Sequence, residues 1–268
     1  FIVLSLTNVR EAIFNAIPLT LKKGVSVGIG LFIAFIGLQN SGLCVDSATL
    51  VGIISFPENF HTAGICALLT LIGLFFTAVF YTRKMKGAIL YGILLTWILG
   101  MLCQVTGLYV PTPDAGFYSL FPSWGMTDFS KLGLTFGQCF NVDFSAVGIV
   151  NFIVVIFSFL FVDIFDTLGT LIGVATKAKM LDKDGKLPGI KPALLADSIA
   201  TSAGAILGTS TTTTFVESAS GVAVGGRTGL TALVTGILFL VSTLFAPIFT
   251  AIPSFATAPA LIMVGFLM

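Results

Sequence analysis

Long apolar runs separated by short polar connections form the main pattern of this sequence. A helix needs about 20 apolar residues to cross the hydrocarbon core of a bilayer, and most of these runs approach that length. The pattern therefore predicts an all-α polytopic membrane protein. The predicted spans cover residues 24–44, 63–81, 87–108, 146–175, 191–207 and 229–250, and a last one begins at about residue 254.

One polar stretch, residues 208–226, lies between two of the apolar runs. Its threonines at 211–214 are β-branched and favour extended backbone, whereas the residues after Glu217 are compatible with a helix. This order predicts a discontinuous strand–half-helix element, which membranes tolerate only against protein or a water-filled cavity. Unpaired N–H groups at the half-helix would make Glu217 a binding group. The alternative is a surface loop rich in serine and threonine.

The fourth span carries a polar face. Asp163, Asp166, Thr167 and Thr170 follow the spacing i, i+3, i+4, i+7, which places them on one side of a helix. A carboxylate inside an apolar span is expensive and usually marks the path of a solute or a proton. We therefore expect this face to point into the protein.

Two further acids, Asp197 and Glu217, lie in or beside the later spans, and no Lys or Arg lies within these spans to pair with any of the acids. Asp197 has two interpretations that the sequence leaves open. It is either a functional group or a protonated carboxyl that hydrogen-bonds a neighbour.

Two short features near the start of the chain have simple structural interpretations. Asn8 and Glu11 have the spacing of a capping box in a lead-in segment, residues 1–23. Gln39 and Asn40, at the end of the first span, either face a cavity or cap the helix. Because the chain begins with Phe1 and ends within an apolar run, we expect it to be a fragment of a longer protein.

Charged residues predict the orientation in the membrane, because cytoplasmic connections are enriched in Lys and Arg. If the spans alternate, one side holds Arg10, Lys22, Lys23, Arg83, Lys84, Lys86, Lys177, Lys179, Lys183, Lys186 and Lys191. The opposite side holds Asp46, Glu58, Asp114, Asp128 and Asp143, with Lys131 as its only base. We therefore predict a cytoplasmic lead-in at 1–23 and an extracytoplasmic loop at 109–145, with a short amphipathic segment on the membrane surface.

Composition excludes several classes of protein. The chain is 56% hydrophobic and 9% charged, whereas a soluble domain has roughly 25% charged residues. The net charge of +1 gives no reason to expect nucleic-acid binding. The four cysteines are scattered singly, so no metal site is predicted. Cys44 and Cys139 fall on the same side of the membrane if the spans alternate, which leaves a disulfide between them open. No nucleophile is paired with a base, so neither an enzyme nor a cofactor is expected.

Four motifs resemble a known family. Residues 28–40 read GIGLFIAFIGLQN, residues 161–170 read FVDIFDTLGT, residues 195–197 read LAD, and residues 208–218 read GTSTTTTFVES. They are similar to the AzgA-like purine nucleobase permeases of the xanthine/uracil permease superfamily, which carry adenine, guanine and hypoxanthine. The resemblance extends over essentially the whole chain.

The resemblance implies a fold of fourteen transmembrane segments in two inverted repeats of seven. Residues 24–108 would be helices of the gate domain, 146–250 helices of the core domain that include the broken element at 208–226, and 251–268 the start of a further gate helix. It also implies that the base-binding residues are Asp163, Glu217, Thr214 and Phe215. The candidates for proton coupling would be Asp163, Asp166 and Glu217.

Together these expectations describe a secondary active transporter of purine nucleobases, either guanine and hypoxanthine or adenine, in the cell membrane. Proton symport by an elevator-like alternating access is expected. The predicted partners are a purine nucleobase, a proton, the lipid bilayer and a second copy of the chain in a homodimer. The alternative is a channel or an anion exchanger of the same fold, against which we count the acids and the lack of a buried base.

Overall fold

A computed structural model describes residues 2–48, 50–141 and 148–268. Asp143 and the predicted start of the fourth span at residue 146 lie outside the described residues. The described chain is mostly helical and divides into two compact units. Unit 1 comprises residues 1–29, 128–223 and 268, and unit 2 comprises residues 30–127 and 224–267. The long helix α3 (Leu19–Asn40) contributes its first part to unit 1 and the remainder to unit 2.

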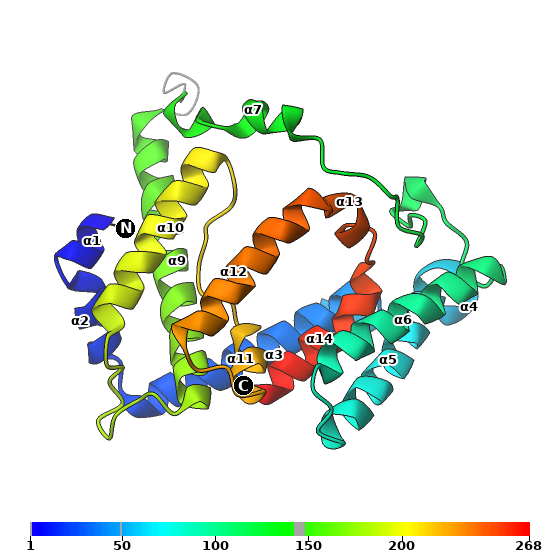
Figure 1. Cartoon of the computed structure of the whole chain (residues 1–268), viewed down its shortest axis with the longest axis horizontal. Coiled ribbons are helices and arrows are strands. Elements are labelled where there is room, and N and C mark those ends of the chain that lie inside the picture. Colours follow the sequence, from blue (N-terminus) through cyan, green and yellow to red (C-terminus); the bar gives the residue numbers. More distant parts are fainter. Residues whose placement is uncertain (1, 49, 142–147) are drawn as a thin grey trace. The chain divides into compact units, whose positions relative to one another are not determined.

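Unit 1 is mainly helical in the part of it that the structure describes (Figure 1). Besides the first part of α3 its helices are α1 (Ile2–Leu6), α2 (Val9–Ala16), η3 (Phe129–Lys131), α7 (Leu132–Thr135), η4 (Gln138–Phe140), α9 (Ile149–Ala178), α10 (Ile190–Leu207) and α11 (Ser218–Ala223). Its core brings Phe14 of α2 against Leu168 and Ile172 of α9 and Leu194 of α10. The lead-in is therefore part of the protein core.

Unit 2 contains the remaining elements. They are α4 (Phe56–Asn59), η1 (Phe60–Gly64), α5 (Ile65–Thr82), α6 (Ala88–Val105), η2 (Pro113–Ala115), α12 (Gly229–Leu244), α13 (Ala246–Phe249), α14 (Ser254–Leu267), and the strands β1 (Cys44–Ser47) and β2 (Leu50–Ile53). The strands pair antiparallel, with Cys44 opposite Ile53. The all-α prediction missed this hairpin, which lies in a connection.

Helices α5, α6 and α14 lie side by side in unit 2 (Figure 1). Small residues allow the close approach of α5 and α6. A Cβ at Gly73 would overlap Thr96, and a Cβ at Gly92 would overlap Thr77. The indole N–H of Trp97 donates to the carbonyl oxygen of Leu120 at 2.9 Å, which ties α6 to the following loop.

Five helical segments of the described chain are long and apolar enough to cross a membrane. They are 19–40, 56–82, 88–105, 149–178 and 190–207, and each overlaps a predicted span. The predicted span 229–250 is divided, because α12 ends at Leu244 and α13 begins with Pro247 in its first turn. Proline lacks an N–H and clashes with the preceding helical turn, so it begins a new helix.

Three expectations about local structure were wrong. Asn8 adopts a left-handed conformation (φ 60°) and its side chain makes no capping bond, so there is no capping box. The helix α3 begins directly after Pro18, so Lys22 and Lys23 lie within it. All four cysteines belong to the described residues and are free, so Cys44 and Cys139 form no disulfide.

Candidate functional site

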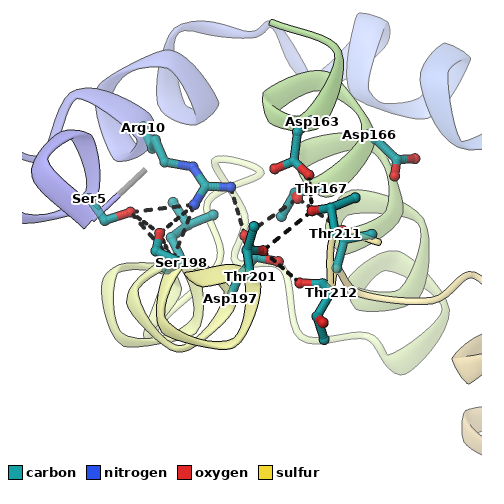
Figure 2. A network of polar contacts seen from close by, with 12 residues as sticks. Ser5, Arg10, Asp163, Asp166, Thr167, Asp197, Ser198, Thr201, Thr211 and Thr212 are labelled. Carbon is teal, nitrogen blue, oxygen red and sulfur yellow. Dashed lines mark hydrogen bonds and ion pairs between the residues drawn. The ribbon is translucent and has the colours of Figure 1, made fainter. Parts of the chain in front are cut away.

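The polar residues of α9 do not all have the same surroundings. Asp163, Thr167 and Thr170 are buried, with at most 7% of each residue exposed, whereas Asp166 is exposed. Figure 2 shows Asp166 apart from the contacts that join the other labelled side chains. The hydroxyl of Thr170 donates to carbonyl oxygens of its own helix, so it serves the helix itself. Asp163 and Thr167 remain as the groups of this face that reach other elements.

The threonine run, residues 211–214, is held in place by side chains of the neighbouring helices and does not pair with a strand. Residues 209–215 adopt neither helix nor strand. Thr211 Oγ1 donates to Asp163 Oδ1 at 2.6 Å (Figure 2). Thr213 shares a hydrogen bond of 2.9 Å with Thr167. From α10, Thr201 Oγ1 donates to the carbonyl oxygen of Thr212 at 2.9 Å. The two helices thus anchor three consecutive threonines.

Asp197 has a cationic partner that sequence reasoning missed. Arg10 of α2 lies 2.8 Å from it, Nη2 to Oδ2, and both side chains are buried. The sequence pattern predicted no basic partner for this acid within the spans, and the lead-in supplies one. The sequence cue that could have revealed this pair is the i, i+4 spacing of Arg10 and Phe14, which places them on one face of a short helix. In the structure both residues are fully buried. Asp197 is thus paired with a cation, a state that neither interpretation drawn from the sequence included.

Asp163 is incompletely satisfied. Its Oδ1 accepts the Thr211 hydroxyl, but its Oδ2 is buried and has no hydrogen-bond partner among the described residues. Asp197 Oδ1 is in the same condition on the other side of the network. Most buried polar atoms in proteins are hydrogen-bonded, so an exception of this kind needs an explanation. Asp163 is such an exception, and its other oxygen joins α9 to the threonine run.

The remaining predicted site residues are more open. Glu217 and Phe215 are exposed and Thr214 is half-buried. The hydrogen bonds of the described residues do not include the Glu217 carboxylate in the network around Asp163. The predicted unpaired N–H groups are also absent, since Ser218, Ala219 and Ser220 donate to the carbonyl oxygens of the three residues 215–217. A tight turn before α11 uses these donors.

Gln39 and Asn40 line a cavity of about 620 Å³ in unit 2, which decides between the two interpretations of this pair. The described residues that line it include no acidic or basic side chain. Tyr109, in its wall, donates its hydroxyl to the carbonyl oxygen of Tyr118, and burial raises the pKa of Tyr109 to about 12. The wall is therefore neutral near pH 7.

A multi-pass membrane protein is the class that the long apolar helices define. A family model described as "Permease family" (Xan_ur_permease) matches residues 1–268, and the chain belongs to this family. It is therefore a multi-pass membrane protein and not an enzyme. Among the described residues no cluster of three His, Cys, Asp or Glu side chains is placed to hold a metal ion.

Relatives with given functions match along the whole chain. The guanine/hypoxanthine permease PbuG of Bacillus subtilis is 46% identical over 100% of this chain and 56% of its own length. The guanine/hypoxanthine permease PbuO of the same organism is 44% identical over 100% of this chain and 58% of its own. The adenine permease AdeQ of Escherichia coli is 40% identical over 99% of this chain and 55% of its own length. The chain thus spans little more than half the length of these relatives.

Proposed function

We propose that the protein is a secondary active transporter of purine nucleobases that couples their uptake to protons. The relatives support the substrate class, because PbuG and PbuO are named guanine/hypoxanthine permeases and AdeQ an adenine permease. The chemistry of the site supports it as well. A purine is flat and neutral with N–H groups and acceptor nitrogens at its edge, so a small number of fixed polar groups can bind it.

The observation that carries the proposal is the free oxygen of Asp163. One carboxylate oxygen is held by Thr211, and the other is buried with no partner among the described residues. A buried carboxylate oxygen without a donor is costly, so it takes either a proton or an N–H group of a ligand. A symporter needs a group that alternates between these two states. Asp163 therefore both receives a purine N–H and serves as a candidate for proton coupling.

The other predicted residues complete the proposed site. Glu217, Thr214 and Phe215 follow the anchored threonines along the chain, and Glu217 and Asp166 present exposed carboxylates. We propose that these two carboxylates mark where the coupling proton enters or leaves the site. We propose that Glu217 binds the base together with Asp163 once the substrate is present, and that residues 208–226 act as the discontinuous element of the transporter.

Elevator-like movement is the proposed mechanism of alternating access. The division of the chain into two compact units supports it, because the acids and threonines belong to unit 1 and the α5, α6 and α14 bundle to unit 2. Helix α12 belongs to unit 2 by its contacts, although residues 146–250 were expected in the core domain. The inverted repeat of seven plus seven segments and the homodimer belong to the same proposal.

A channel or an anion exchanger is the competing function. The buried Arg10 removes part of the argument against it, since a buried base does exist. Its guanidinium is engaged by Asp197 and Ser198, however, and the neighbouring acids would repel an anion. The paired state of Arg10 therefore favours a neutral substrate.

Uptake of radiolabelled nucleobases tests the proposed function. The full-length protein is expressed in an Escherichia coli strain that lacks its own purine permeases, and uptake is measured between pH 5.5 and 8. Saturable accumulation of guanine, hypoxanthine or adenine that collapses with a protonophore is the expected result. Unlabelled xanthine and uracil serve as competitors. Uptake that equilibrates without accumulation would indicate a channel, and exchange for an inorganic anion would indicate the other alternative.

A further inference from the structure

Arg10 is fully buried and makes directional contacts to two other elements of unit 1. Its Nη2 donates to Asp197 Oδ2 at 2.8 Å, and its Nη1 donates to Ser198 Oγ at 2.8 Å and to the carbonyl oxygen of Leu194 at 3.2 Å. Nη1 also approaches Ser5 Oγ of α1 at 3.4 Å, and Ser5 shares a 2.7 Å hydrogen bond with Ser198. A planar guanidinium can satisfy several acceptors at fixed angles, so it sets the rotation of α10 about its axis.

The same face of α10 holds the threonine run. Asp197 Oδ2, which receives Arg10, also lies 3.5 Å from the hydroxyl of Thr167, and Thr167 shares a hydrogen bond with Thr213. One turn further along α10, Thr201 donates to the carbonyl oxygen of Thr212. Figure 2 shows the contact of Arg10 with Asp197 and that of Thr201 with Thr212 near the bond from Thr211 to Asp163. A rotation of α10 would disturb both anchors together.

We propose that Arg10 is a positioning residue of the transport site, and that its ion pair with Asp197 persists through the transport cycle to hold residues 211–213 against Asp163. This inference rests on the proposed function. Because Arg10 supplies the positive charge that Asp197 needs, Asp197 has no need of a proton and does not couple proton movement. That task falls to the carboxylates without a cationic partner among the described residues, of which Asp163 is the buried one.

The test replaces the ion pair by a neutral pair. Arg10→Gln alone leaves a buried carboxylate without its cation, and a low amount of folded protein is expected. The double variant R10Q/D197N keeps hydrogen-bonding groups but removes both charges, and near-normal abundance is expected because no charge remains buried alone. Arg83→Gln, which removes an exposed cation at the end of α5, is the matched control.

Hydrogen–deuterium exchange of purified full-length protein measures how firmly the threonine run is held, and it needs no substrate. Peptides that cover residues 209–217 should exchange faster in R10Q/D197N than in the wild type, and peptides of α5 and α6 should not change. The Arg83→Gln variant should match the wild type throughout. Unchanged exchange of residues 209–217 in the double variant would overturn the positioning role.

Uptake kinetics test whether Asp197 takes part in proton coupling. In R10Q/D197N the KM should rise roughly five-fold, which corresponds to the net contribution of one ordinary hydrogen bond. The pH dependence of uptake should stay as in the wild type. Loss of the pH dependence would overturn the inference, because it would make Asp197 a coupling group. If the wild type itself carries no nucleobase, the proposed function fails, and the exchange experiment still decides the positioning role.

Discussion

The hydroxyl of Thr211 donates to Asp163 Oδ1 across 48 positions of sequence, at a distance of 2.6 Å. This bond joins the carboxylate of a long apolar helix to a segment that has no regular secondary structure. It orients the carboxylate and leaves its second oxygen directed away from that bond. A substitution of Asp163 or of Thr211 should therefore affect the other residue as well.

Asp163→Asn should weaken nucleobase affinity by about ten-fold or more. The amide oxygen can still accept from Thr211, but the second position becomes an N–H₂ group that cannot accept a purine N–H. A charge-assisted bond is roughly twice as strong as a neutral one, so on the order of 1.5–3 kcal/mol of binding should be lost. Competition uptake at equal expression measures this. Thr211→Val, which removes only the orienting hydroxyl, is the control and should have a smaller effect. Wild-type affinity in Asp163→Asn would refute the site.

Glu217→Gln should lower the affinity about ten-fold with the protein still in the membrane. The substitution keeps the size and one acceptor oxygen but cannot ionise, so a charge-assisted bond becomes a neutral one worth about 1–2 kcal/mol less. Glu217→Ala should have a larger effect because it also removes the acceptor oxygen that glutamine retains. Asp46→Asn changes an exposed acid of β1 and should leave uptake unaltered. Normal kinetics in both Glu217 variants would remove this residue from the site.

The predicted orientation can be tested by cysteine labelling in whole cells. In a background with Cys44 and Cys139 replaced by serine, a Lys183→Cys variant should resist a membrane-impermeant maleimide until the cells are opened. Asp114→Cys should react in intact cells. Both positions are exposed, so accessibility to the reagent depends on the side of the membrane. Labelling of position 183 from outside the cell would show that the predicted orientation is wrong.

Gly92→Ala should destabilise unit 2 by about 1–3 kcal/mol, the usual cost of forcing extra atoms into a tight contact. The new Cβ would overlap Oγ1 of Thr77 and lie 2.9 Å from its Cβ, so α5 and α6 would have to separate. Gly28→Ala is the matched control, since nothing lies within 4 Å of a Cβ there. Thermal unfolding in detergent, followed by thiol exposure of Cys66, measures the difference. Equal melting temperatures would mean that the contact can relax.

Local patterns predicted the features that depend on near neighbours. The apolar runs predicted the spanning helices, and the spacing of Asp163 and Thr167 predicted that they share a buried face. The ion pair of Arg10 and Asp197 escaped because its partners are 187 positions apart, and only tertiary packing brings α2 onto α10. The free N–H groups expected after Glu217 were lost to a tight turn, because a chain satisfies nearby donors first. The β1–β2 hairpin lies in a connection where the alternation of apolar residues is weak.

Arg10 leaves the ribosome long before the carboxylate that will receive it. Asp197 follows 187 residues later, and at about 5–20 residues per second roughly 10–40 s of synthesis separate the two. During that interval the guanidinium has to remain in water or among lipid headgroups, because a charge in hydrocarbon is expensive. The burial of Arg10 against its partner therefore has to wait until α10 has been made, and α2 reaches its final position late in synthesis.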